Sequence, residues 1–229
     1  MSTSTTSLYT LVPSPDHVLE GHPESPRRFQ YFDQLFESPL TDFLSYVEPI
    51  AAKVEALTAV HPETYLQALQ QAAQQGPGFV DYGDTYVTPA SFDAALLASG
   101  ASIEIVSGVA GGNAQSGFAF VRPPGHHATN TRAMGFCLLN NIAIATRHAQ
   151  SLGFERVLIV DFDVHHGNGT QDIFERDENV QFLSTHQAGI YPGTGFVKET
   201  GLEEGEGTIV NIPLPPRAGD QAFKKVFTE

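Results

Sequence analysis

Short runs of β-forming residues alternate with helix-forming stretches along most of this 229-residue chain. The β-forming runs lie at residues 117–121, 156–161, 180–184 and 208–212. The helix-forming stretches lie at 26–37, 62–75, 91–109, 140–152 and 170–176, with a further one beginning near 220. Alternation of this kind predicts an α/β fold with a parallel sheet and helices on both faces. Residues 1–21 are polar and irregular, and we expect no regular element there.

The composition predicts one soluble domain that spans residues 1–229. A chain of this length can bury the core of one α/β domain, and no repeat or linker divides it. A net charge of -14 with only 12 Lys and Arg disfavours direct binding of nucleic acid. The single cysteine, Cys137, fits a reducing compartment. No signal peptide and no apolar run of about 20 residues is evident, so we expect a cytoplasmic protein without a membrane partner. The oligomeric state is not predicted.

Polar residues follow directly after the β-forming run at 156–160. Because side chains alternate along a strand, Asp161, Asp163 and His165 are expected on one face, opposite Phe162 and Val164. Two carboxylates and an imidazole together would be costly to bury unless they held a cation. Mixed oxygen and nitrogen ligation suits Zn²⁺ or a similar first-row metal. The segment therefore predicts a metal site, against the alternative of an acidic surface loop.

A second polar cluster follows the run at 117–121. His126 and His127 come after a rigid Pro-Pro-Gly turn, and two consecutive histidines there cannot both face a core. Ligands of α/β proteins gather at the carboxyl ends of strands. An imidazole beside a metal is suited to general acid–base catalysis. Alone, the pair would fit a surface loop, but a second polar strand end in the same chain favours a catalytic role.

Four segments, in this order along the chain, resemble the zinc-dependent histone deacetylases: residues 122–128, 135–141, 161–170 and 191–195. The similarity extends from His22 to about Phe223. The family also includes acetylpolyamine amidohydrolases and acetoin-utilisation proteins, and Asn168 is similar to the class II and bacterial branch. The resemblance implies an arginase-like α/β fold, and hydrolysis of acetyl-lysine or an acetylated polyamine.

The resemblance also implies roles for individual residues. Asp163 and His165 would be zinc ligands, His127 the general base, and His126 its acidic or electrostatic partner at the leaving amine. Such a site works because zinc activates water and polarises the amide carbonyl. The family's residues that orient the two histidines match Asp161 and Asn168, the latter standing where many members have Asp.

Two aromatic residues and a second cation site complete the resemblance. Phe136 and Tyr191 match the walls of the narrow channel for the acyl-lysine side chain, although either could be an ordinary core aromatic. A potassium ion would be held by Asp161, Asp163, His165, Ser184 and Thr185, largely through main-chain carbonyls. The other histidines and Cys137 are expected to be surface or packing residues.

One zinc ligand is missing from the pattern. A catalytic zinc takes three protein ligands, and the chain supplies two. The family's Gly-Phe-Asp loop and Gly-Gly-Tyr stretch do not occur after Tyr191, and residues 220–227 begin a helix that the chain end interrupts. We therefore expect the amino-terminal portion of a longer deacetylase, inactive by itself. The alternatives are a non-catalytic acyl-lysine or metabolite-binding fragment, and a metal hydrolase of the ureohydrolase type.

Overall fold

The computed structural model describes residues 7–32, 34, 37, 39–81 and 83–228. Contacts between residues group the chain into two compact units, Met1–Gly153 and Phe154–Glu229. Each unit is described by itself. The boundary falls between the helix at 141–151 and the strand at 157–161.

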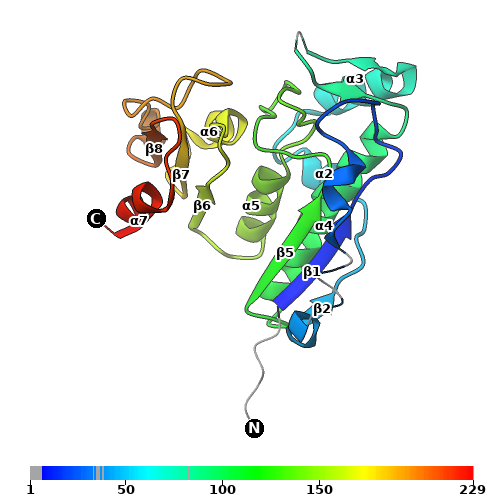
Figure 1. Cartoon of the computed structure of the whole chain (residues 1–229), viewed down its shortest axis with the longest axis horizontal. Helices are drawn as coiled ribbons and strands as arrows, with labels where there is room; N and C mark the ends of the chain where they lie inside the picture. Colours follow the sequence, from blue (N-terminus) through cyan, green and yellow to red (C-terminus); the bar gives the residue numbers. More distant parts are fainter. Residues whose placement is uncertain (1–6, 33, 35–36, 38, 82, 229) are drawn as a thin grey trace. The chain divides into compact units, whose positions relative to one another are not determined.

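The first unit is built on a parallel sheet (Figure 1). Its strands lie in the order β2 (Leu44–Tyr46), β1 (Ser7–Val12) and β5 (Ser116–Val121). Helix α4 (Ser91–Ala110) runs along β1 and β5 and also contacts α5 (Asn141–Ser151). Smaller elements complete the unit: 3₁₀ turns at Pro26–Phe29 and Pro39–Phe43, helices α2 (Val54–Leu57) and α3 (Glu63–Gln75), and an antiparallel pair, β3 (Gly78–Phe79) and β4 (Tyr86–Val87).

Strand β1 corrects the expectation for the amino-terminal segment. Residues 7–12 form the central strand of the sheet, whereas the sequence predicted irregular structure over 1–21. Leu8 and Val12 are buried, and Thr10 is buried with them, so a polar residue at a core position concealed the apolar alternation. The predicted helix at 26–37 is also corrected at its start, where Pro26–Phe29 is a 3₁₀ turn. Part of the remainder lies outside the described residues.

Helix α4 bears on the expectation that no uninterrupted apolar run of about 20 residues occurs, since Asp93 and Glu104 interrupt its apolar sequence. Its 20 residues are long and apolar enough to cross a membrane by length and composition. Nine of its residues are buried, among them Ala95, Ala98 and Ala101, each 0% exposed. The contacts of α4 with β1, β5 and α5 account for its apolar composition as that of a core helix.

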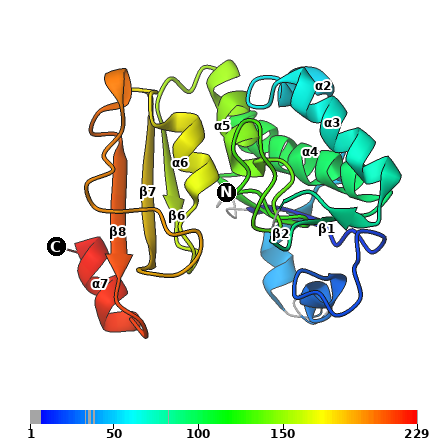
Figure 2. The ribbon, with the colours of Figure 1, turned by 90° about the horizontal axis from the view of Figure 1, so that it is seen from above.

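The second unit holds another parallel sheet, whose three strands lie side by side in Figure 2. Its order is β6 (Val157–Asp161), β7 (Val180–Gln187) and β8 (Ile209–Leu214). Helix α6 (Asn168–Phe174) packs on β7, a 3₁₀ turn lies at Glu203–Gly205, and α7 (Asp220–Thr228) comes last. The predicted alternation of strands and helices is confirmed in both units, and all strand pairs in the two larger sheets are parallel.

The β-forming run at 156–160 suggested a buried strand, but strand β6 is buried on one face only. Among the described residues of the second unit, it is the first strand of the order β6-β7-β8 and pairs with β7. Ile159 is 6% exposed, but Leu158 and Val160 are 58% and 40% exposed. The alternation of side chains is therefore present, with one face buried and the other open.

Replacing Gly100 of α4 by Ala should destabilise the protein. A Cβ atom there would lie 1.7 Å from the carbonyl oxygen of Ile50 and 2.6 Å from the amide nitrogen of Ala52. Ala is a better helix former than Gly by about 1 kcal/mol. Overpacking a core typically costs about 1–3 kcal/mol, and a contact this close with main-chain atoms, which cannot move aside as a side chain can, belongs at the upper end of that range. Denaturant unfolding should show a net loss of stability. Gly78→Ala is the control, since a Cβ at Gly78 meets nothing within 4 Å; equal stability of the two variants would contradict the packing described.

Candidate functional site

The tandem-histidine turn, residues 122–128, follows β5 and is fixed by hydrogen bonds from α5 and its N-cap. The side-chain amide of Asn141 donates to the carbonyl oxygen of Pro123 at 3.1 Å. The side-chain amide of Asn140 donates to the carbonyl oxygen of Ala128 at 3.0 Å. Within the turn, the N–H of Ala128 donates to the carbonyl of Gly125 at 3.1 Å. The two ends of the turn are thus held by one helix end, which fixes the main chain that carries the histidines.

The two histidines lie ring against ring. The ring centroids of His126 and His127 are 4.0 Å apart, and His127 is only 4% exposed. The ring of His127 also covers Gly135, where a Cβ atom would lie 2.3 Å from its Cδ2. Gly135 has φ +55°, so a side chain there would be strained as well as obstructed. This glycine lets the segment at 135–137 approach the imidazole closely.

Phe136, predicted as a channel wall, is placed directly beside this contact. Its main chain is in the left-handed region at φ +70°, and its N–H donates to Thr85 Oγ1 at 3.0 Å. The Phe136 ring meets that of His22 edge to face, with 4.8 Å between centroids. Its neighbour Cys137 is 0% exposed, as expected for a packing residue. The first unit therefore brings His126, His127 and Phe136 together.

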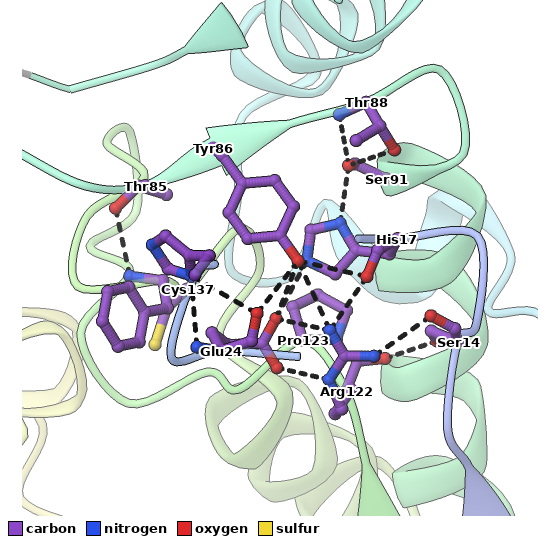
Figure 3. Close-up of polar contacts among 12 residues, drawn as sticks. Ser14, His17, Glu24, Thr85, Tyr86, Thr88, Ser91, Arg122, Pro123 and Cys137 are labelled. Atoms are coloured by element: carbon purple, nitrogen blue, oxygen red, sulfur yellow. Dashed lines mark hydrogen bonds and ion pairs between the residues drawn. The ribbon is translucent and has the colours of Figure 1, made fainter. Parts of the chain in front are cut away.

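Arg122, the first residue of the turn, is fully buried and forms an ion pair with Glu24 (Figure 3). Arg122 Nε donates to Glu24 Oε1 at 2.5 Å, and Nη2 donates to Glu24 Oε2 at 2.7 Å. Burial alone raises the pKa of the Glu24 carboxyl, but hydrogen bonds from His17 and Arg122 outweigh burial and lower it to about 2. Glu24 is therefore ionised in the folded protein at neutral pH.

His61 is a second buried group that supports the turn. It is 0% exposed, its Nδ1 donates to the carbonyl of Asn130 at 3.0 Å, and its Nε2 accepts the N–H of Asn140 at 2.9 Å. Burial lowers the pKa of His61 to about 4, despite the hydrogen bond to Asn130. A neutral His61 thus orients the residue that caps α5. Packing was one of the two roles expected for it, but its link to the turn was not predicted.

The two predicted zinc ligands lie side by side at the end of β6. Asp163 Oδ1 is 3.2 Å from His165 Nδ1 and accepts the main-chain N–H of His165 at 2.8 Å. The side chains of both residues are about half exposed, at 50% and 41%. Phe162 and Val164 are exposed at 74% and 53%. Two donors of the types that zinc prefers therefore converge from residues two apart.

Two of the predicted potassium ligands, Asp161 and Ser184, pair across neighbouring strands. The parallel register pairs Asp161 of β6 with Ser184 of β7. Asp161 Oδ1 accepts the N–H of Asp163 at 3.1 Å, and Ser184 Oγ lies 2.9 Å from His186 Nδ1. Thr185 Oγ1 is buried without a hydrogen-bond partner, and strand alternation directs it to the face opposite Ser184. Only the carbonyl of Thr185 could therefore join a cation on the Ser184 side.

Asn168 and Tyr191 lie near this strand end in the second unit. Asn168 is the first residue of α6, and its N–H donates to the carbonyl of His166 at 2.9 Å. Tyr191 is 43% exposed, and its ring meets that of His165 edge to face with 6.1 Å between centroids. Tyr191 is thus an exposed aromatic beside a predicted zinc ligand, not an ordinary core residue.

Two buried histidines support the loop that carries Tyr191. His166 Nδ1 is 2.8 Å from Thr194 Oγ1, and His186 Nε2 is 3.0 Å from the carbonyl oxygen of Gly195. A Cβ atom at Gly195 would lie 2.4 Å from His186 Nε2 and 2.7 Å from His166 Cγ. Packing, one of the two roles expected for these histidines, is confirmed by these contacts.

The donor set at the end of β6 fits a metal ion in part. Within the described residues, no group of three or more His, Cys, Asp and Glu side chains is arranged to hold a metal ion. Asp163 and His165 supply an oxygen and a nitrogen at adjoining positions. A catalytic zinc takes three protein ligands. The pair therefore fits two of the ligands, and the described chain shows no third one.

The comparisons with known proteins point to one family. A model of the histone deacetylase domain matches residues 22–229. A probable deacetylase from Archaeoglobus fulgidus is 44% identical over 91% of this chain and 58% of its own length. A histone deacetylase-like amidohydrolase from Pseudomonas aeruginosa is 38% identical over 90% of this chain and 55% of its own length. The chain thus spans little more than half of these curated relatives.

A solved structure gives the same result. The crystal structure of the HDA15 HD domain is 36% identical, covers 91% of this chain and 63% of its own, and superposes with a TM-score of 0.85. The predicted deacetylase-like α/β fold is therefore confirmed. The roles of the individual site residues remain predictions.

Glu24→Gln should lower stability and flatten its dependence on acid. The folded-state pKa of Glu24, about 2, lies below its ordinary 4.5. The ionised carboxylate therefore contributes stability above pH 4.5, and this contribution is lost as the pH falls from 4.5 towards 2. At pH 7 the variant leaves Arg122 buried without its counter-charge, which costs about 3–5 kcal/mol.

Denaturant unfolding between pH 7 and pH 2 measures both effects. Glu20→Gln, the same chemical change at an exposed position four residues earlier, is the control and should change stability by less than about 0.5 kcal/mol. If Glu24→Gln kept the full wild-type stability and acid dependence, the account of the buried pair would be wrong.

Proposed function

The chain belongs to the histone deacetylase family, and we propose that the whole protein hydrolyses acetylated amines in a zinc-dependent reaction. Because the chain spans 55–58% of the length of two curated relatives, the proposal concerns the whole protein. The observation that carries it is the approach of Asp163 Oδ1 to His165 Nδ1, 3.2 Å apart at the end of a parallel strand. These are the oxygen and nitrogen donors that a zinc site of this family would use.

The proposed metal site uses Asp163 and His165, with one more ligand still to be identified. Zinc, when bound, supplies a Lewis acid that polarises an amide carbonyl and makes water a stronger nucleophile. Asp163 also accepts the N–H of His165. This hydrogen bond restricts the main chain between the two ligands and so orients both of them. Asp161, paired with Ser184 across the strands, would support a potassium ion behind them.

The tandem histidines would move the protons. Hydrolysis of an amide requires a base that takes a proton from the attacking water and an acid that gives one to the leaving amine. His127, almost fully buried against Gly135, is proposed as the base, and the more exposed His126 as its partner at the leaving group.

Phe136 and Tyr191 are proposed to hold the substrate chain. A linear acyl-amine side chain consists mainly of methylene groups. Burying apolar surface of this kind against aromatic rings contributes a favourable free energy of about 25 cal/mol per Å². Phe136 is half buried beside His127, and Tyr191 is exposed beside His165. Both acetyl-lysine and an acetylated polyamine share this linear apolar segment, and the proposal covers that class of substrate.

His127→Ala should lower kcat for an acetyl-lysine substrate by about 10²–10⁴-fold, because it removes the base. Zinc content should stay at the wild-type level, since His127 is not proposed as a ligand. His148→Ala is the control, because His148 lies on α5 and hydrogen-bonds Ser107 at 2.7 Å. Wild-type turnover by His127→Ala would remove the role assigned to it.

Asp163→Ala should abolish turnover together with zinc binding. The substitution removes one ligand and leaves His165 without its neighbour at 3.2 Å. Metal analysis of the purified whole protein, with a chelator-treated sample as reference, measures the zinc. Full zinc occupancy in this variant would mean that the metal site lies elsewhere, and wild-type turnover after complete zinc removal would show that the reaction needs no zinc.

A further inference from the structure

We propose that Glu24 is a positioning residue for this site: through Arg122 it fixes the tandem-histidine turn, and through the main chain and His22 it fixes the ring of Phe136. The role of the turn rests on the proposed function, but the positioning itself can be measured without turnover. Figure 3 shows Glu24 beside Arg122, with His17 and Tyr86 close to the same carboxylate. These contacts were not evident from the sequence, where Glu24 and Arg122 are 98 residues apart.

All five N–H donors of Arg122 are satisfied in one arrangement. Two bonds go to the carboxylate of Glu24, and the others go to main-chain carbonyls of Pro13, Ser14 and His17, at 2.6, 3.1 and 2.9 Å. The carbonyl of Arg122 in turn accepts Ser14 Oγ–H at 2.7 Å. A planar fork that is fully bonded on every side holds its own main chain in one position. The residue so held is the first of the turn that carries His126 and His127.

The carboxylate of Glu24 also contacts two aromatic rings, those of Tyr86 and His17. Tyr86 Oη lies 3.2 Å from Glu24 Oε2, and its ring stacks on His17 with 4.5 Å between centroids. His17 Nε2 lies 3.4 Å from Glu24 Oε2, and its Nδ1 lies 2.7 Å from Ser91 Oγ. The ionised carboxylate of Glu24 therefore contacts His17 and Tyr86 directly, and through His17 it is linked to Ser91 at the start of α4.

The connection to Phe136 runs through His22. The main-chain N–H of Glu24 donates to His22 Nδ1 at 3.1 Å, and His22 Nε2 donates to the carbonyl of Asp84 at 2.9 Å. With both nitrogens bonded, the His22 ring is fixed in its plane. Its edge-to-face contact with Phe136 then sets where that ring can lie. Residue 24 thus has two separable effects: its carboxylate fixes the histidine turn through Arg122, and its main-chain N–H fixes the aromatic wall through His22.

The two effects predict a split in the kinetics of the whole protein. Glu24→Gln should lower kcat about 10–100-fold, because displacing catalytic groups by about an ångström has effects of this size. His22→Ala should raise KM and leave kcat within about twofold, because it releases Phe136 and leaves the Arg122 fork intact. Arg122→Lys keeps the charge but has three donors in place of five, so it should behave like Glu24→Gln.

Imidazole NMR spectra of histidine-labelled whole protein test the positioning apart from activity. In Glu24→Gln, folded by circular dichroism, the His126 and His127 resonances should shift, and in the control Glu20→Gln they should not. Tyr86→Phe keeps the ion pair and removes one hydroxyl, so it should fold and give a smaller shift of the same resonances. A purely structural role would lower the melting temperature and leave the resonances of the folded protein unchanged.

The outcomes separate the two proposals. Shifted resonances in a protein that does not hydrolyse acetylated amines would keep the positioning and overturn the proposed function. Unchanged resonances in folded Glu24→Gln, or in Tyr86→Phe if Glu24→Gln does not fold, would overturn the positioning whatever the activity. Equal changes of kcat and KM in Glu24→Gln and His22→Ala would contradict the two separable effects.

Discussion

The buried ion pair of Glu24 and Arg122 holds the first residue of the tandem-histidine turn in place. A guanidinium with no exposed surface must have each of its donors bonded, and the carboxylate beside it must be ionised. The bonds that satisfy Arg122 join the end of β5 to the loop that follows β1, because their acceptors are Glu24 and the main chain of residues 13–17. The tandem-histidine turn begins at this end of β5. Its geometry is therefore a consequence of charge burial as much as of the sheet.

In the second unit, the alternation of side chains along β6 positions the polar residues that follow the strand. β6 buries Ile159 and leaves Leu158 and Val160 open. Continued past the strand end, the same alternation places Asp163 beside His165 and Phe162 in solvent. The cross-strand pairing of Asp161 with Ser184 adds a polar group behind them. Acidic, imidazole and hydroxyl groups thus gather at the carboxyl end of a parallel sheet, where ligands of α/β proteins bind.

Most of the strands and helices, and the adjacency of Asp163 and His165, could be predicted from the sequence. The strands and helices after residue 90 have strong periodicity and glycine or proline boundaries, and they occur where expected. The adjacency of Asp163 and His165 follows from a local two-residue period. Strand β1 was missed because Thr10 occupies a core position in a short strand. Glu24, His22 and His61 could not be assigned their roles, because their partners lie 62 to 98 residues away in the sequence.

X-ray absorption at the zinc edge of the whole protein tests the central claim most directly. The claim is that the end of β6 holds zinc through the Asp163 carboxylate and the His165 imidazole. The account predicts a first shell of oxygen and nitrogen at about 2.0–2.2 Å with at least one imidazole and no sulfur. A sulfur shell near 2.3 Å, or an imidazole signal that persists unchanged in His165→Ala, would contradict it.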